Sequence, residues 1–252
     1  MANSISEIKT EFNNLKVNEY SGFIGKYSGD SRSGVVSLVK KAGVKIEKYE
    51  AELVRTERML SYEKEYSMYS AICGIDEAGR GPLAGPVVAG AVILPADEKI
   101  LYLNDSKQLS AAKRDELYDV IFSRSVSASV GIVDHDRIDA INILCATYEA
   151  MRLAIMNLSK KPDILLNDAV TIPGIDIKQV PIIKGDAKSC SIAAASIIAK
   201  VTRDRIMAEM DKQYPEYGFA QNKGYGSAAH IEAIRKYGPC KIHRRTFIGN
   251  FI

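Results

Sequence analysis

The sequence has no tryptophan, only three histidines and four cysteines, and no long apolar run. The cysteines stand alone at wide intervals, a spacing that predicts neither a zinc site nor a disulfide framework. The longest apolar segments, residues 87–94 and 192–199, are far shorter than the roughly 20 residues that a membrane-spanning helix needs. The first twelve residues lack the basic and then apolar stretch of a signal peptide. We therefore expect a reduced, soluble, cytoplasmic protein without membrane association.

The composition is otherwise ordinary, with 46% hydrophobic and 26% charged residues in a chain of 252. These values exclude wholesale disorder and collagen-like or low-complexity chains, and the length suits one large domain or two smaller ones. Residues 71–183 carry 11 basic against 15 acidic side chains, whereas residues 184–252 carry 12 against 6. An acidic middle and a basic end are typical of a protein that holds cations among carboxylates beside a polyanion. Scattered, solvated surface charge would give the same counts, so charge alone leaves both interpretations open.

Residues 1–67 are predicted to form a small helical N-terminal domain. Ser4 and Glu7 have the spacing of a capping box ahead of an amphipathic stretch. Residues 20–34 are rich in glycine, serine and tyrosine and predict a loop. From about residue 44 to 66, apolar side chains recur on one helical face. None of these segments carries a recognisable catalytic pattern.

From residue 71 onward, short apolar segments alternate with turns and longer amphipathic stretches. Strands are expected at 71–76, 87–94, 127–133, 163–168 and 179–183, and helices at 111–122, 136–158, 189–210 and 227–237. The short link between the first two strands predicts an antiparallel hairpin. Strands that come first and then alternate with helices predict an α/β domain over residues 71–252, in which helices flank a mixed five-stranded sheet.

Acidic residues follow the predicted strands. Asp76 and Glu77 close the first strand, Asp168 closes the fourth, and Asp186 comes shortly after the fifth. Strand ends in α/β sheets are where functional side chains converge, and carboxylates gathered there resist joint ionisation unless cations neutralise them. Oxygen ligands without nearby histidine or cysteine favour Mg²⁺ or Mn²⁺, and two such ions roughly 3.5–4 Å apart can promote phosphodiester hydrolysis. Any one of these acids alone could be a cap or a surface group, but together they predict a metal site.

Asp76 and Glu77 are adjacent, so in a regular strand they would point to opposite faces of the sheet. Both can serve one site only if the strand breaks there, and residues 78–82 (AGRGP) have the composition to break it. The glycines of this segment also hint at a dinucleotide-binding turn. Their spacing is GxGxxxG, however, and a strand follows instead of the helix that would hold a pyrophosphate. A nucleotide cofactor is therefore not expected.

Five segments, taken in order, resemble bacterial ribonuclease HII: IDEAGRGPLAGPVVAGAVIL, NDSKQLS, LLNDA, IIKGDAKSCSIAAASIIAKVTRDR and NKGYGSAAHIEAI. The resemblance runs from about residue 72 to the end of the chain. It implies the ribonuclease H-like fold and an endonuclease that cuts the RNA strand of RNA–DNA hybrids, including single ribonucleotides embedded in duplex DNA. It further implies 5′-phosphate and 3′-hydroxyl products, removal of ribonucleotides from DNA as a repair step, and an enzyme that works as a monomer.

The resemblance also assigns roles to individual residues. The metal-binding acids of the family match Asp76, Glu77 and Asp168, and its fourth active-site acid matches Asp186. The element that senses the ribose 2′-hydroxyl matches Gly79, Arg80 and Gly81, and the tyrosine that senses the RNA–DNA junction matches Tyr225; Lys107 and Lys184 are assigned to substrate binding. The sister family, ribonuclease HIII, has GTG in place of GRG and a larger, sheet-containing N-terminal domain. Asn222 and Asn167 depart from the residues that are commoner in the family.

Several of these residues have simpler interpretations. Lys107 could be plain surface, and Tyr225 could be a loop aromatic that only packs on the body of the protein. Asp204, between two arginines, is expected to form a structural ion pair, and the alanine-rich residues 191–199 to serve close helix packing. Residues 1–67 could widen the contact with the hybrid or act as a passive cap.

Two other functions were weighed against a catalytic ribonuclease. A hybrid-binding module without catalysis would gain nothing from burying four like charges. Another nuclease or strand transferase of the same fold would need no 2′-hydroxyl sensor. Both alternatives are therefore less favoured than a ribonuclease with a two-metal site.

Overall fold

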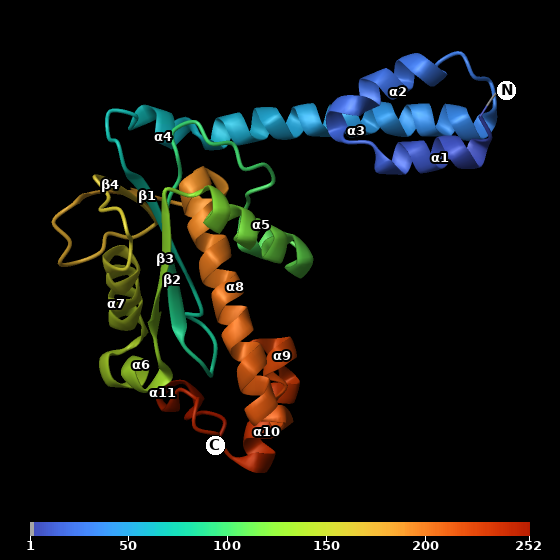
Figure 1. Ribbon diagram of the computed structural model, residues 1–252. Helices are drawn as coiled ribbons and strands as arrows, with labels where there is room; N and C mark the ends of the chain where they lie inside the picture. Colours follow the sequence, from blue (N-terminus) through green and yellow to red (C-terminus); the bar gives the residue numbers. More distant parts are fainter. Residues whose placement is uncertain (1–2) are drawn as a thin grey trace. The chain divides into compact units, whose positions relative to one another are not determined.

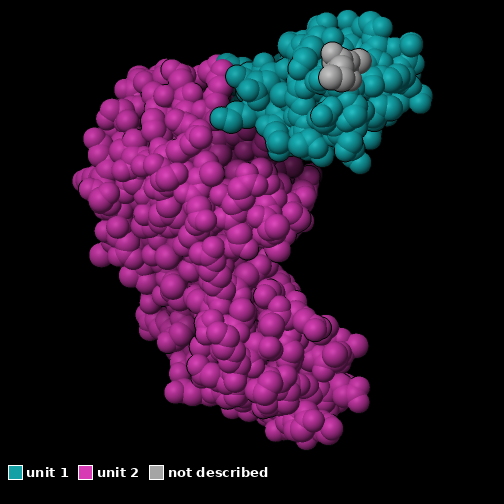
Figure 2. Space-filling view, turned by 45° about the vertical axis from the view of Figure 1, so that its right-hand side comes forward, with its two compact units in different colours: residues 1–58 teal, residues 59–252 magenta. Residues whose placement is uncertain are grey.

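The computed structural model describes residues 3–252, which divide into two compact units, residues 3–58 and 59–252 (Figure 2). The helices are α1 Ile5–Asn14, α2 Tyr20–Tyr27, α3 Ser33–Met59, α4 Ser61–Glu65, α5 Ala111–Arg124, α6 His135–Ile141, α7 Ile143–Met156, α8 Cys190–Gln213, α9 Phe219–Asn222, α10 Ala228–Tyr237 and α11 Arg245–Ile248. The strands are β1 Ile72–Ala78, β2 Val87–Ile93, β3 Ser127–Val133, β4 Ile164–Asp168 and β5 Lys178–Ile182. Within residues 3–252 no helix combines the length and apolar character that crossing a membrane requires.

The first unit is helical, as the sequence predicts. The capping box at the start of α1 is present: Ser4 Oγ accepts from the Glu7 amide and Glu7 Oε2 from the Ser4 amide. The predicted loop at residues 20–34 is wrong, because α2 occupies residues 20–27 and α3 begins at residue 33. Tyr20, Phe23 and Tyr27 recur at helical spacing, and their rings are buried with Phe12 of α1. Burial of this aromatic face outweighs the low helix propensity of the intervening glycines.

The structure also corrects the bounds and continuity of two of the predicted helices. The helix expected at residues 44–66 starts earlier, at residue 33, and is interrupted between α3 and α4 at Leu60. The helix expected at 136–158 is divided by Asn142, which has a φ of 66° and caps α7 through its side chain. Asparagine tolerates this left-handed conformation better than most residues.

The second unit is built on a mixed five-stranded sheet of order β3-β2-β1-β4-β5 (Figure 1), which confirms the predicted fold class. β1 pairs antiparallel with β2, as the short link predicts, and β2 pairs antiparallel with β3. β1, β4 and β5 run parallel. The carboxyl ends of these three strands therefore meet at one edge of the sheet.

Helices cover both faces of the sheet. α7 packs on one face with Ala150, Met151 and Ala154, whereas the alanine-rich start of α8 packs on the other. A Cβ on Gly74 would lie 2.0 Å from the Ser191 carbonyl carbon, and one on Gly90 would lie 2.3 Å from the Ala195 carbonyl oxygen. The backbones of β1 and β2 thus approach α8 as closely as glycine allows. This confirms that the alanine-rich segment serves close packing.

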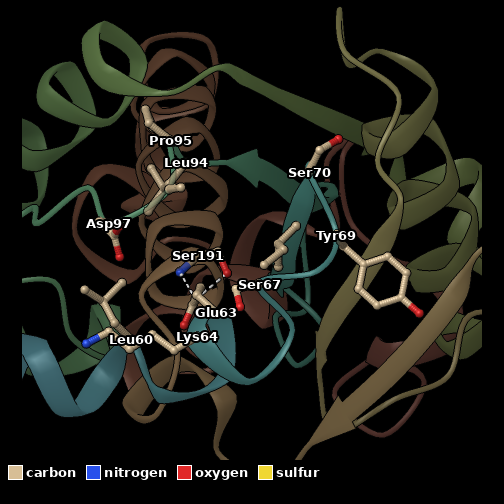
Figure 3. A pocket seen from close by; sticks show the side chains of 12 residues that line it. Leu60, Glu63, Lys64, Ser67, Tyr69, Ser70, Leu94, Pro95, Asp97 and Ser191 are labelled. Atoms are coloured by element: carbon tan, nitrogen blue, oxygen red, sulfur yellow. Dashed lines mark hydrogen bonds between the residues drawn. The ribbon is translucent and has the colours of Figure 1, made fainter.

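Helix α4 is fastened to the start of α8 by one buried oxygen (Figure 3). Glu63 Oε1 accepts from the Ser189 hydroxyl at 2.6 Å and from the Ser191 amide and hydroxyl at 2.9 and 2.7 Å. Its carboxylate thereby satisfies donors at a helix N-terminus, where negative charge is favourable. Glu63 also lines a cavity of about 120 Å³ between α4 and the segments that flank β1 and β2.

We expect Glu63→Ala to lower the free energy of unfolding by about 2 kcal/mol, because three charge-assisted hydrogen bonds are lost. Calorimetry should show a Tm that is roughly 4–8 °C lower. Glu65→Ala, at an exposed position of the same helix, is the matched control and should leave Tm unchanged. Equal Tm values for the two variants would show that Glu63 does not anchor α4.

Candidate active site

The sheet topology brings the predicted acids to one edge. Asp76 and Glu77 lie near the end of β1, Asp168 ends β4, and Asp186 lies in the short 3-10 helix Gly185–Ala187 after β5. The Gly185 amide donates to Asp168 Oδ1 at 2.7 Å, which ties the end of β4 to the loop that carries Asp186. Electrostatic coupling links Asp168 to Asp76, Glu77 and Asp186, so the four acids form one charged group.

The expected break of β1 directly after Glu77 is wrong in detail. Pairing with β2 continues to Ala78, but pairing with β4 stops at Ile75. Beyond Ile75 the β1–β2 hairpin therefore runs without a neighbour on the β4 side. Glu77 lines the same cleft as Asp76 although the two are adjacent in a strand.

Burial makes these carboxylates costly to ionise. Asp76 is 6% exposed, and burial together with the negative charge of Glu77 raises its carboxyl pKa well above the ordinary value. Burial also raises the pKa of Glu77, while Arg80, 3.3 Å away, acts in the opposite direction. Burial raises the pKa of Asp186 as well, with Asp105 and Asp168 contributing repulsion. Such a cluster favours an added cation.

Two of the four acids, Asp76 and Glu77, border a cleft of about 560 Å³. Its lining includes Asp76, Glu77, the Gly79-Arg80-Gly81 turn, Lys107 and Tyr225. The Tyr225 side is open, with Tyr225 itself 45% exposed. Lys184 is exposed, has a left-handed backbone conformation and does not line this cleft. The cleft lining thus gathers Asp76, Glu77, the turn, one predicted lysine and the tyrosine, and it does not include Asp168, Asp186 or Lys184. Asp168 is nevertheless coupled by charge to Asp76, Glu77 and Asp186.

Two buried arginines hold the Gly79–Pro86 segment in place. Arg203 donates to the carbonyls of Pro86, Lys223 and Ala84 at 2.9–3.1 Å. Arg244 donates to the carbonyls of Gly79, Arg80, Gly85 and Pro86 at 2.6–3.2 Å. Both side chains are at most 1% exposed. Their planar guanidinium groups satisfy carbonyls of the segment between β1 and β2, whose β pairing is an isolated bridge between Ala84 and His243.

Little in the sequence indicates a buried role for these two arginines, because the RDR and HRR segments are typical of surface charge. It also missed Ser196, Ser106 and Lys200, which line the cleft. Ser196 hydrogen-bonds with Asp76 and lies 3.1 Å from the Ser106 hydroxyl. Lys200 follows Ser196 by four residues on α8, so helical spacing places both on one face. That polar pair, within the apolar first half of α8, was the available signal.

Local side-chain contacts account for three further residues that the sequence analysis singles out, namely Asp204, Asn222 and Asn167. Asp204 forms ion pairs with Lys200 at 2.6 Å and Arg114 at 3.7 Å, as expected. Asn222 shapes the loop of residues 222–226, which carries Tyr225 and is called the tyrosine loop below. Its Nδ2 donates to the Tyr217 carbonyl and its Oδ1 accepts from the Gly224 amide, both at 2.7 Å. Asn167 is buried and donates to Gln179 Oε1 at 2.8 Å. The two departures from the family pattern are thus accommodated by local hydrogen bonds.

The donor set suits a hard divalent cation. Across residues 3–252, no three His, Cys, Asp or Glu side chains are already grouped as ligands. The Asp76 and Asp168 carboxylates instead accept from nearby backbone amides, and Glu77 pairs with Arg80. Carboxylate oxygens with raised pKa values and no sulfur or imidazole in the described lining fit Mg²⁺ or Mn²⁺ better than zinc. A cation would relieve the repulsion among the acids.

Comparison with known protein families gives two matches. Residues 73–250 match the model described as Ribonuclease HII. Residues 4–67 match the model described as Ribonuclease HII N-terminal domain. The two models together span nearly the whole chain.

Individual proteins agree with these matches. The chain is 58% identical over 246 residues to "Ribonuclease HII" of Lachnoclostridium phytofermentans, covering 98% of this chain and 97% of that protein. It is 53% identical over 251 residues to "Ribonuclease HII" of Clostridioides difficile, covering 99% and 98%. Among solved structures, the ribonuclease H2 of Pyrococcus horikoshii superposes with a TM-score of 0.59 at 31% identity, covering 70% of this chain and 93% of that one.

Proposed function

The chain belongs to the ribonuclease HII family and is an endoribonuclease that cleaves the RNA strand of RNA–DNA hybrids, and we propose that it does so by metal-dependent hydrolysis at the Asp76 cleft. We propose further that it also cuts at single ribonucleotides embedded in duplex DNA, as an early step of their removal. The observation that carries both proposals is the cleft itself. It joins Asp76, Glu77, the Gly79-Arg80-Gly81 turn and Tyr225 in one space, and the charge of Asp168 couples to that of Asp76 and Glu77.

In this proposal, Asp76, Glu77, Asp168 and Asp186 hold two divalent cations. When bound, such ions activate a water molecule and stabilise the leaving oxygen. The chain itself supplies the positioning: the Gly185 amide orients Asp168, the Glu77 amide orients Asp76, and Ser196 contacts Asp76. Lys107 and Lys200 bring positive charge to the cleft, where a backbone phosphate would lie. Products with 5′-phosphate and 3′-hydroxyl ends follow from breaking the P–O3′ bond.

We assign recognition of the ribonucleotide to the Gly79-Arg80-Gly81 turn. Gly79 lines the cleft and has a φ of 98°, and a Cβ there would collide with Arg203 and the Pro86 carbonyl oxygen. The ribose 2′-hydroxyl donates and accepts hydrogen bonds, so backbone groups of a tight turn can distinguish ribose from deoxyribose. Arg80, half-exposed and held by Glu77, lies where it can reach the adjoining phosphate.

We expect Tyr225→Ala to reduce kcat/KM about 5- to 100-fold on a duplex with one ribonucleotide, because the ring packs on the next deoxyribose. The loss on a continuous RNA–DNA hybrid should be smaller, since a ribose at that position fits the ring less well. The measurement compares both substrates, with Mn²⁺ present, for wild type and variant. All-DNA duplex should remain uncut by either enzyme.

Equal losses on the two substrates would show that Tyr225 aids binding without sensing the junction. Cleavage of the single-ribonucleotide duplex in excess chelator would contradict the metal mechanism independently. Tyr237→Ala, at another exposed tyrosine, is the matched control and should leave both activities unchanged.

We propose that residues 71–252 hold all of the chemistry and that the N-terminal region, residues 1–67, adds affinity for the substrate. The first unit has a depression of about 320 Å³ lined by Phe12, Val44 and three lysines, Lys40, Lys41 and Lys45. In the part of the chain that the structure describes, none of the three lysines pairs with a carboxylate. Lys45 donates to the Tyr20 hydroxyl at 2.7 Å, so Lys40 and Lys41 are the lysines whose charge is available to a nucleic-acid backbone.

The double variant Lys40→Gln/Lys41→Gln should raise KM roughly tenfold at moderate salt with kcat unchanged, because phosphate contacts are lost away from the chemistry. The slope of log affinity against log salt concentration should become less steep by up to about 1.8. Binding titrations at several salt concentrations measure both effects. Lys9→Gln/Lys16→Gln, outside the depression, is the matched control; a fall in kcat with unchanged slope would contradict the proposed role.

A further inference from the structure

Two buried histidines lie behind the tyrosine loop. His230, in α10, and His243, just before α11, are 0% and 1% exposed, and their Nε2 atoms are 3.0 Å apart. His230 Nδ1 lies 2.8 Å from the Tyr225 carbonyl oxygen. His243 Nδ1 lies 3.0 Å from the Cys240 amide nitrogen. The two rings therefore form one hydrogen-bonded chain from Cys240 to Tyr225.

The end groups of this chain determine where its protons lie. The Cys240 amide can only donate, so His243 Nδ1 is the acceptor and the neutral ring carries its proton on Nε2. That proton is donated to His230 Nε2, and His230 in turn carries its proton on Nδ1. The Tyr225 carbonyl can only accept, and the Nδ1 proton of His230 meets it. Every hydrogen bond then has one donor and one acceptor.

The surroundings favour this neutral pair. The His243 ring packs against Tyr217 at 4.9 Å and the His230 ring against Phe219 at 5.3 Å between centroids. Burial lowers the pKa of His230, and burial with the neighbouring ring lowers the pKa of His243 to about 4. Both rings are thus uncharged at neutral pH, as the proton positions require.

The chain ends on the backbone of the residue assigned to junction sensing. The Tyr225 amide donates to the Asn222 carbonyl at 2.9 Å, and the Tyr225 carbonyl accepts from the Ser227 amide and from His230, each at 2.8 Å, so both backbone groups of Tyr225 are fixed. The Tyr225 side chain remains 45% exposed. We propose that His230 and His243 are positioning residues that fix the backbone of Tyr225 and thereby the direction of its ring. This inference rests on the proposed role of Tyr225 in substrate recognition.

The first test observes the histidines directly in the full chain by ¹⁵N NMR. The sequence has three histidines, so single substitutions assign every ring. At neutral pH we expect His230 to be protonated on Nδ1 only and His243 on Nε2 only. A charged ring, or the opposite tautomer of either histidine, would overturn the inference. This readout does not depend on activity and so is independent of whether Tyr225 senses the junction.

The second test asks whether His230 acts through Tyr225. We expect His230→Leu to lower kcat/KM on the single-ribonucleotide duplex about tenfold more than on the continuous hybrid, a loss of the size that one aromatic contact contributes. In the Tyr225→Ala background the same substitution should leave the ratio of the two activities unchanged. His230→Asn, whose amide can still donate to the Tyr225 carbonyl, should restore most of the ratio.

A structural role alone predicts different results. Equal loss on both substrates, or a further change of the ratio in the Tyr225→Ala background, would overturn the positioning role. His135→Leu, at the third histidine, is the control and should leave the ratio unchanged. If Tyr225→Ala itself leaves the ratio unchanged, the proposed junction role fails, whereas the NMR result separately decides whether the histidine chain exists.

Discussion

Asp76→Asn and Asp168→Asn should each lower kcat by about 10³-fold or more, because each removes a carboxylate from the proposed metal site. Metal-ion catalysis supplies several kcal/mol of transition-state stabilisation, and each 1.4 kcal/mol is a factor of ten in rate. The amide oxygen of asparagine can still accept from the Glu77 or Gly185 amide, so the local fold should persist. Single-turnover assays in Mn²⁺ measure the effect. Asp204→Asn, at an ion pair on α8, should alter stability more than kcat.

The same substitution at Asp76 should stabilise the metal-free protein. The pKa values of Asp76 and Glu77 are raised from their ordinary 3.8 and 4.5, so the folded protein binds more protons than the unfolded chain above those values. The free energy of unfolding therefore falls as pH rises through the raised pKa values. Asp76→Asn removes one charge from the pair, and at pH 8 with chelator its Tm should exceed that of wild type by roughly 2–4 °C.

Thermal unfolding between pH 5 and pH 8, with and without chelator, separates the loss of a metal ligand from the relief of charge repulsion. Added Mn²⁺ should raise the Tm of wild type and leave that of Asp76→Asn nearly unchanged. A variant that is inactive and also less stable at every pH would indicate a misfolded site and not a lost metal ligand.

Gly79→Ala should lower the free energy of unfolding by about 3 kcal/mol, which corresponds to a Tm decrease of roughly 6–12 °C. Gly79 has a φ of 98°, and a Cβ there would lie 2.1 Å from Arg203 Nε and 2.7 Å from the Pro86 carbonyl oxygen. Arg203 has no room to retreat, because its guanidinium is buried and bonded to three carbonyls. Activity should fall at least 100-fold, since the turn beside Asp76 is displaced.

Gly81→Ala is the matched control two residues away. A Cβ on Gly81 would meet only Tyr225 Cε1, at 3.8 Å, which is an ordinary contact. Its Tm should therefore stay within about 1 °C of wild type. A similar Tm loss for both variants would show that the turn is generally intolerant and that the Arg203 contact is not the cause.

Local sequence patterns determined much of this protein. The capping box of α1, the hairpin of β1 and β2 and the positions of the five strands along the chain follow from spacing and turn chemistry within short segments. The acids could be predicted because burying like charges is costly, so several of them at strand ends indicate a site. Patterns of this kind involve residues that are close together in the chain, so they can be recognised without the tertiary structure.

Only the tertiary structure decided the rest. Residues 20–27 are helical because three aromatic side chains find a partner in α1, which no local propensity shows. Arg203, Arg244, His230 and His243 look like ordinary polar residues in the sequence, yet all four are buried. The arginines donate to carbonyl groups up to 165 positions away in the chain, and the two histidines bond to each other across 13 positions. Hydrogen-bond partners at such separation are set by how the sheet, α8 and the C-terminal helices pack. The sequence therefore identified the acids, and the packing identified what holds the turn and the tyrosine beside them.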